Sequence, residues 1–216
     1  MLERPEPSWS FDSFEPLISN ETMSTHVLEL HQGYVDKLNK WSQKNSFDLS
    51  VKPSEILMNL SRYLDEDQKD FFIDMMGGHV THTLLWKTIN PESKGVDYSK
   101  SVFLNDYEIS QGEVKKEIIK LGLDRFGSGW VWGVLDKRNE FKMYSTLNHN
   151  TPYMRKQMPL FCIDLWEHAY FIDRHGDRKS WLNAVCEFID FNTIDEVYSN
   201  FLIGNNILDH WCLKGY

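Results

Sequence analysis

The segment "DLWEHAY", residues 164–170, contains side chains that could bind a metal ion. Asp164 and His168 lie four positions apart in it, where an apolar run gives way to a helical pattern. At this spacing the two side chains can turn toward the same side of the chain. A carboxylate and an imidazole are common metal ligands. The segment therefore supplies half of a metal site, and the other half must come from elsewhere.

His26 is the first candidate for the other half. Apolar residues at steps of three and four predict a helix over residues 20–41, with Ser19 or Asn20 as its N-cap. On an α-helix with this pattern, His26 shares a face with three later residues. They are Leu30, Gly33 and Tyr34.

His82 is the second candidate, on a helix expected from about residue 67 to 87. Gly78 and Trp86 lie one turn before and one turn after it, on the same face. A glycine one turn from a candidate ligand leaves space there. A group from elsewhere in the chain can fill this space.

These residues together give three neutral imidazoles and one carboxylate from separate elements. Such a set suits iron or manganese with an open coordination position. Zinc is an alternative, but there is no HExxH motif and no nucleophile paired with a base to indicate a hydrolase. A non-haem iron oxygenase would need two histidines and one carboxylate, so the third histidine argues against it. The remaining helical histidines are interpreted as structural: His31, His79, His175 and His210.

Four segments of the chain resemble the iron/manganese superoxide dismutase family, in the family's order. They are "FEPLISNETMSTHVLELHQGYVDKLN", "GGHVTHTLLW", "RFGSGWVW" and "DLWEHAYFID". The resemblance extends over roughly residues 8–198. It does not include a C-terminal extension from about residue 199, "SNFLIGNNILDHWCLKGY".

The resemblance implies a superoxide dismutase, which converts superoxide to oxygen and hydrogen peroxide. It implies one iron or manganese ion per subunit and a tyrosine, Tyr34, beside the substrate channel. The implied metal ligands are His26, His82, Asp164 and His168, and the aromatic shell is Trp86, Trp130 and Trp166. Glu167 matches an acid that bonds a ligand histidine of the partner subunit, which implies a homodimer.

The family holds a metal-bound solvent molecule with a glutamine from one of two positions. In typical iron enzymes this glutamine lies four residues before the second ligand, where this chain has Gly78. In manganese enzymes it follows an S-T-x-N stretch, where "STLNHNTP" places His149. This resembles a minority of members that use iron or either metal, so both metals stay open.

Two further positions differ from the family together. A polar bridge between subunits usually joins a histidine to a tyrosine, and Leu30 and Phe171 occupy these places. Loss of both ends of a buried polar pair can be nearly neutral, so we interpret this as a repacked dimer contact. The two changes and the extension also motivate an alternative, a non-catalytic binding or structural protein on the same fold.

The elements that must position these side chains are segregated along the chain. Residues 1–91 read as an N-terminal α-helical hairpin, and residues 92–216 as a C-terminal domain. The second part contains a helix over about 108–127, strands near 129–137 and 140–147, an apolar run at 158–166 and a helix at 178–191. The expected class is α+β, with a small antiparallel three-stranded sheet.

Composition excludes several classes of protein. A hydrophobic content of 41% in 216 residues is enough for a substantial core, without an apolar run that would cross a membrane. A net charge of −9 argues against nucleic acid as the main partner. The three cysteines, Cys162, Cys186 and Cys212, are odd in number and far apart, which argues against a disulfide framework and a thiolate zinc site. No targeting segment is visible at the N-terminus, so we expect a cytoplasmic protein.

Overall fold

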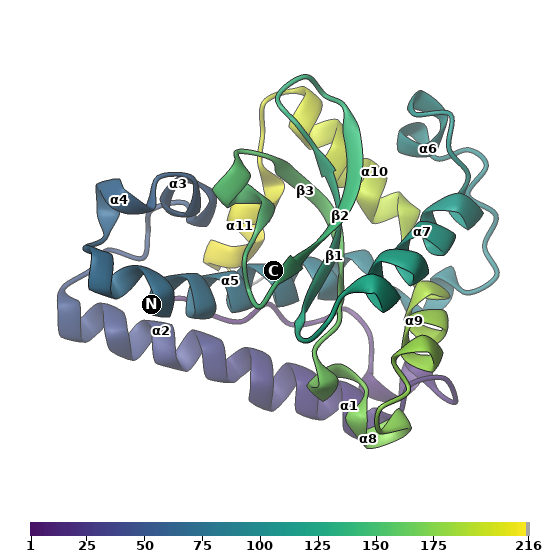
Figure 1. The fold of residues 1–216 in the computed structure, drawn as a ribbon, viewed down its shortest axis with the longest axis horizontal. Helices are drawn as coiled ribbons and strands as arrows, with labels where there is room; N and C mark the ends of the chain where they lie inside the picture. The colour runs from purple at the N-terminus through teal and green to yellow at the C-terminus, as the bar shows by residue number, and fades with distance from the viewer. Residues whose placement is uncertain (215–216) are drawn as a thin grey trace.

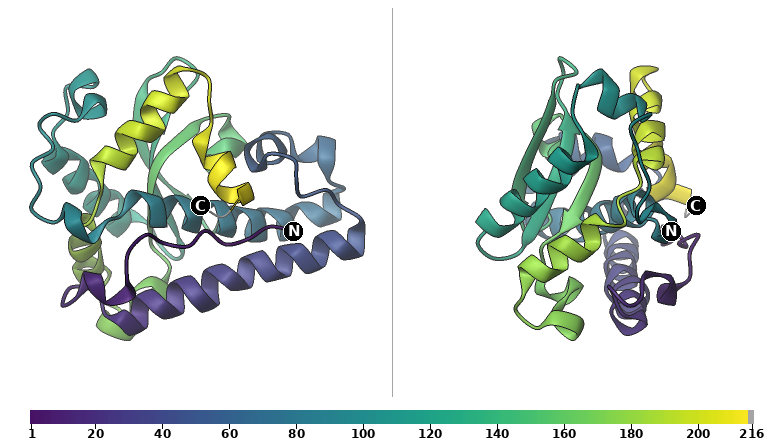
Figure 2. Two further views of the ribbon diagram at one scale, coloured as in Figure 1. Left: turned by 180° about the vertical axis from the view of Figure 1, so that it is seen from behind. Right: turned by 90° about the vertical axis from the view of Figure 1, so that its right-hand side faces the viewer.

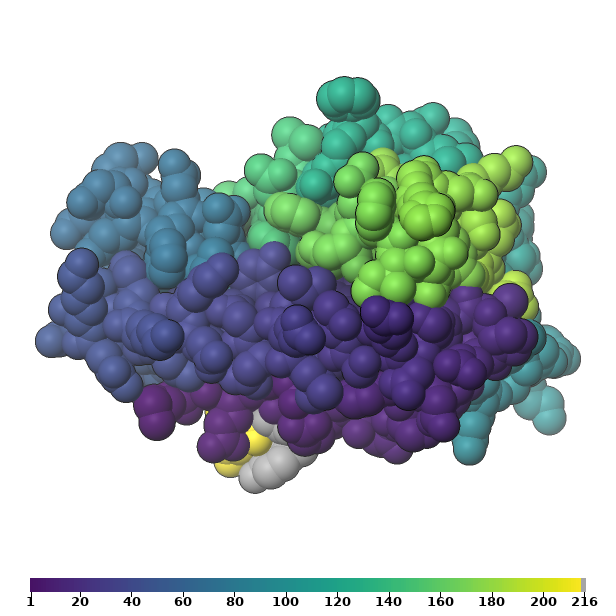
Figure 3. All heavy atoms as spheres, turned by 90° about the horizontal axis from the view of Figure 1, so that it is seen from below, coloured from purple at the N-terminus to yellow at the C-terminus, as the bar shows by residue number. Residues whose placement is uncertain are grey.

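The computed structural model describes residues 1–214. Two long antiparallel helices form an N-terminal hairpin, and a three-stranded antiparallel sheet with surrounding helices lies against one of them (Figure 1). The predicted fold class is confirmed. Seen from below, the first 45 residues extend across most of the lower face (Figure 3).

The first helix of the hairpin contains a π-helical turn. It consists of α1 (Asn20–Ser24), a π-helix (Thr25–His31) and α2 (Gln32–Asn45). The Ser19 hydroxyl caps the start by accepting a hydrogen bond from the Thr22 amide, at 3.1 Å. The wider turn changes the spacing of residues on a face, so the next buried histidine after His26 is His31, while Leu30 is half-buried.

The second helix of the hairpin is the centre of the core. It follows α3 (Pro53–Met58) and α4 (Leu60–Tyr63), and it is α5 (Glu66–Thr88). The Gln68 side chain accepts a hydrogen bond from the Asp65 amide at 3.1 Å, which caps the start of α5. Every residue from 76 to 86 is buried, so this stretch is surrounded by protein on all sides.

The sheet places two predicted site residues next to each other. Helices α6 (Val102–Asp106) and α7 (Gln111–Asp124) lead into β1 (Gly129–Leu135), which lies between β2 (Phe141–Leu147) and β3 (Met158–Asp164). The antiparallel register of β1 and β3 sets Trp130 opposite Asp164. Helix α7 packs on β1 and β2, whereas α5 packs on β3.

The C-terminal part differs from the sequence-based prediction. After α8 (Phe171–Arg174), the helix expected over 178–191 ends early, at Cys186 of α9 (Arg178–Cys186), and a separate helix, α10 (Phe191–Leu202), follows. The Asp190 side chain accepts from the Asn192 amide at 3.0 Å and so starts a new helix. The extension, for which the sequence predicts no structure, completes α10 and forms α11 (Ile207–Lys214), which lies against α5 (Figure 2).

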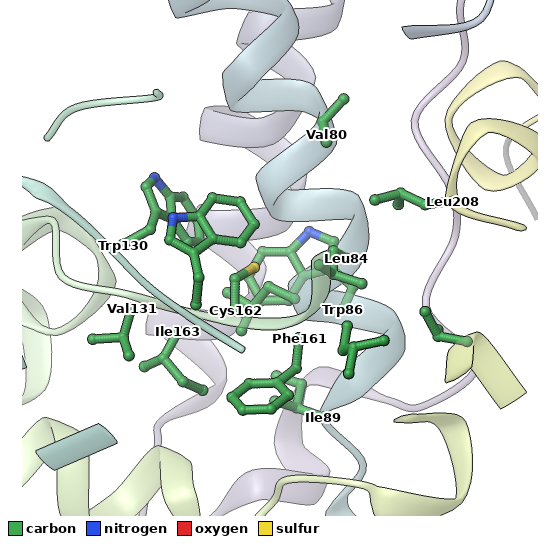
Figure 4. Packing of buried hydrophobic residues seen from close by; sticks show 14 of the residues in the cluster. Val80, Leu84, Trp86, Ile89, Trp130, Val131, Phe161, Cys162, Ile163 and Leu208 are labelled. Atoms are coloured by element: carbon green, nitrogen blue, oxygen red, sulfur yellow. The ribbon is translucent and has the colours of Figure 1, made fainter. Parts of the chain in front are cut away.

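The core is continuous from the sheet to the extension. Figure 4 shows Val80 and Leu84 of α5 between the sheet residues Val131 and Ile163 and Leu208 of α11. All three cysteines are free and buried. Among residues 1–214, none of the helices has the length and apolar character needed to cross a membrane.

Candidate metal centre

Four side chains converge in the interior between the hairpin and the sheet. They are His26, His82, Asp164 and His168, and one donor atom of each lies within 4.8 Å of the donors of the others. Asp164 Oδ2 is 3.1 Å from His26 Nε2, 3.7 Å from His82 Nε2 and 3.2 Å from His168 Nε2. The π-helical turn supplies His26, α5 supplies His82, the end of β3 supplies Asp164, and the short turn after β3 supplies His168. The structure thus brings together the four residues that the sequence predicts as ligands.

The tautomer of His82 suits a metal ligand. Its Nδ1 lies 2.7 Å from the Gly78 carbonyl oxygen, which can only accept, so Nδ1 carries the proton. The lone pair on Nε2 then faces His26 Nε2, 3.0 Å away. Burial lowers the pKa of both imidazoles and favours their neutral forms. Three imidazole nitrogens and a carboxylate oxygen directed to one buried point are a donor set that binds iron or manganese, so these residues fit a metal ion.

Asp164 is held as a carboxylate in this interior. Burial alone would raise its pKa, but the charge of His168 and hydrogen bonds to His168 and His26 outweigh that effect and keep the pKa below its ordinary value. The Trp166 amide donates to the other oxygen, Oδ1, at 2.7 Å and orients the group. One carboxylate and three neutral imidazoles leave a site with a divalent or trivalent ion positively charged overall.

His149 joins the centre to Tyr34. The Trp130 indole Nε1–H can only donate, and it lies 3.3 Å from His149 Nδ1. A neutral His149 therefore carries its proton on Nε2, which donates to the Tyr34 hydroxyl at 2.7 Å. Burial lowers the pKa of His149 to about 4, so it is neutral near pH 7. Burial also raises the pKa of Tyr34, with a smaller effect from the negative charge of Asp164, so its phenol stays protonated.

Two glycines of α5 make room for this pair. A Cβ on Gly78 would lie 2.7 Å from Cδ1 of Tyr34, and a Cβ on Gly77 would meet the backbone oxygen of His149. The space that the sequence predicts beside His82 is thus filled by the ring of Tyr34 and by the loop that contains His149.

Tryptophan rings surround the candidate ligands. Trp86 meets the ring of His26 edge-on, with centroids 4.7 Å apart and an interplanar angle of 87°. The closest ring contacts of the other two are Trp130 edge-on to His82 at 5.1 Å and Trp166 stacked on His149 at 4.6 Å. Of the four candidate ligands only His168 is appreciably accessible, with 21% of its side chain exposed. The accessible side of the centre is therefore at His168 and the half-buried Tyr34.

Three residues predicted to lie at a subunit contact are at the surface. Glu167 is exposed, Phe171 is 53% exposed and Leu30 is half-buried. Their roles toward a partner subunit stay predictions. His175 and His210 are also exposed.

Two histidines interpreted as structural from the sequence, His31 and His79, lie close to each other, and His31 lies close to a candidate ligand. His31 and His79 are fully buried, and the ring of His31 stacks on that of His82 with centroids 5.3 Å apart. His31 follows His26 by five residues, which is the repeat of a π-helix. A search for α-helical spacing does not select it.

The chain matches two family models along most of its length. Residues 3–90 match the model described as the alpha-hairpin domain of iron/manganese superoxide dismutases. Residues 103–197 match the model described as the C-terminal domain of the same enzymes. The candidate ligands lie inside the two matches, and α11 lies outside them.

Proposed function

The chain belongs to the iron/manganese superoxide dismutase family, and from this premise we propose that it converts superoxide to oxygen and hydrogen peroxide. The observation that carries the proposal is the buried cluster of three imidazoles and one carboxylate. The hydrogen-bonded pair of His149 and Tyr34 next to it adds support.

We propose that His26, His82, Asp164 and His168 hold one iron or manganese ion per subunit. When bound, this ion would supply one-electron chemistry by cycling between two oxidation states. The single carboxylate keeps the loaded site cationic, which attracts the superoxide anion. The tryptophan rings exclude water and limit the movement of the ligand rings.

The protons for peroxide come from Tyr34, which is half-buried and reaches solvent. His149 donates its Nε2–H to the Tyr34 hydroxyl, so the Tyr34 O–H is the donor at the accessible side of the centre, and the bond from Trp130 fixes the orientation of His149. Because Tyr34 is half-buried, it can exchange its proton with bulk water. The family position of His149 is compatible with either metal, so the proposal covers both iron and manganese.

We also propose a homodimer and a cytoplasmic location. The exposed Glu167 and Phe171 lie one and three residues from His168 in the sequence and are available to a second copy. Sedimentation velocity on the metal-loaded protein tests the dimer, and a single monomeric species would contradict it.

The function is tested by the decay of superoxide in a stopped-flow experiment. The protein is produced with iron and manganese both available, its metal content is measured, and each metal form is assayed. Asp164→Ala should lose metal and activity together, since it removes the only carboxylate from the cluster. Asp70→Ala, on an exposed position of α5, is the matched control and should keep both. A fully loaded protein that does not consume superoxide would refute the enzyme and favour the non-catalytic alternative.

A further inference from the structure

Buried hydrogen bonds connect the metal centre to the C-terminal extension. Trp86 Nε1 lies 3.0 Å from His31 Nδ1, and His31 Nε2 lies 2.9 Å from His79 Nδ1. His79 Nε2 lies 2.9 Å from the carbonyl oxygen of Cys212 in α11. We call this series, from Trp86 through His31 and His79 to the Cys212 carbonyl, the histidine chain.

The two ends of the histidine chain determine the direction of every bond in it. The Cys212 carbonyl can only accept, so His79 carries a proton on Nε2 and its Nδ1 accepts from His31. His31 then carries its own proton on Nε2. Its Nδ1 accepts from the indole of Trp86, which can only donate. One arrangement of protons, with both imidazoles neutral, satisfies all three bonds.

At its inner end, the histidine chain contacts two candidate metal ligands. Trp86 meets His26 edge-on at 4.7 Å, and His31 stacks on His82 at 5.3 Å with an interplanar angle of 24°. Because these rings are buried, a change in the position of Trp86 or His31 must change the space available to the ligands.

At its outer end, the carbonyl is held in place by the packing of α11. The Asp209 carboxylate accepts from the amide of Ser54 at 2.9 Å and from its hydroxyl at 2.5 Å, at the start of α3. Leu208 is buried against α5 (Figure 4), and the Lys87 ammonium lies 5.5 Å from the centre of the Trp211 ring. The extension thus presents its acceptor to His79 from a fixed position.

We propose that α11 (Ile207–Lys214), the last part of the C-terminal extension, is a positioning element of the metal centre that acts through the histidine chain. The proposal rests on the metal site of the proposed function but not on its reaction with superoxide. Without the Cys212 carbonyl, the Nε2–H of His79 would be buried without an acceptor, and the chain would have to rearrange to satisfy it. Trp86 and His31 would then hold the ligand rings less firmly.

The proton arrangement is tested first, by ¹⁵N NMR of the imidazole nitrogens in the metal-free full-length protein. The expected result is that His31 and His79 are both neutral with the proton on Nε2. An Nδ1 proton on either would overturn the proposal. This measurement needs no substitution and no bound metal.

The effect on the centre is tested by the rate at which manganese(II) leaves the protein for excess EDTA. Deletion of residues 207–216 should speed release about tenfold, the lower end of what partners of metal-ligand histidines contribute. His79→Leu keeps the extension and breaks the histidine chain, so it should have the same effect. His79→Gln retains a donor and an acceptor and should restore most of the retention, while Leu213→Ala, at a half-buried position of α11, is the control.

Each outcome decides the proposal separately from the enzyme activity. Unchanged release in both His79→Leu and the deletion variant would overturn it, even if the protein consumes superoxide. If the deletion variant does not fold, the comparison of His79→Leu with His79→Gln decides, and equal release rates for these two would also overturn it. A protein that fails to consume superoxide but shows the expected release rates would refute the proposed function alone.

Discussion

Replacement of His149 by leucine tests the arrangement beside the metal centre. The substitution places an apolar side chain of similar size in the buried loop and removes both ring nitrogens. The Trp130 indole then loses its acceptor, and the Tyr34 hydroxyl loses the donor 2.7 Å away. Trp130 is fully buried, so no water replaces the lost acceptor, whereas the half-buried Tyr34 can bond to water.

The magnitude follows from this difference. A buried polar group without a partner costs about 1–3 kcal/mol, and the loss of an ordinary hydrogen bond about 0.5–1.5 kcal/mol. His149→Leu should therefore lower the free energy of unfolding by about 1.5–4.5 kcal/mol. His149→Gln places an amide oxygen and an amide N–H in the same space, can make both bonds and should lose less than about 1 kcal/mol.

Urea unfolding of the metal-free proteins measures both values. Metal-free protein is used because binding of an ion to the folded state would add its own stabilisation. Equal free energies of unfolding for His149→Leu and His149→Gln would refute the hydrogen-bond assignment. In the loaded protein, His149→Gln should keep the metal and shift its reduction potential. Unchanged activity of that variant with both metals would remove His149 from the role proposed for it.

Other predictions concern single positions. Gly78→Ala should lose about 1–3 kcal/mol in urea unfolding because its Cβ would displace Tyr34, whereas Gly33→Ala, with nothing within 4 Å, should lose nothing; equal values would contradict this. His168→Ala should lose metal and activity together, measured by elemental analysis and superoxide decay; retention of both would exclude His168 as a ligand. Burial lowers the pKa of His79 from 6.5 to about 4. As the pH falls, the imidazole of His79 is therefore protonated in the unfolded chain before it is protonated in the folded protein. Stability of the metal-free protein should fall from pH 6.5 to 4, at up to about 1.4 kcal/mol per unit from this group. His79→Gln should reduce that slope, and an unchanged slope would contradict the assignment.

Local patterns are sufficient to predict several elements of the fold. Alternation and turn residues locate β1 and β2, and the Ser19 cap with periodic apolar residues locates the first helix of the hairpin. The π-helical turn is not visible in this way, because a wider turn depends on the packing around it more than on residue type. Leu28 and Glu29 are exposed and Leu30 is half-buried, whereas His31 turns inward, contrary to α-helical spacing.

The sequence predicts the four candidate ligands but not the hydrogen bonds around them. Motifs select the four candidate ligands because coordination restricts residue type and spacing. The partner of His79 is a backbone carbonyl, and any residue at position 212 supplies one, so no pattern of side chains marks this bond. The break between α9 and α10 is not visible in the sequence pattern for a related reason. Asp190 acts as the N-cap of α10, and whether an aspartate caps a helix depends on where the chain changes direction to pack its apolar residues on the core.

Anomalous X-ray diffraction from crystals of the metal-loaded protein, at the iron and manganese edges, tests the central claim most directly. The account predicts one ion per chain, in contact with Nε2 of the three histidines His26, His82 and His168 and with Oδ2 of Asp164. An ion bound elsewhere, or bound while one of these four side chains points away from it, would contradict the account.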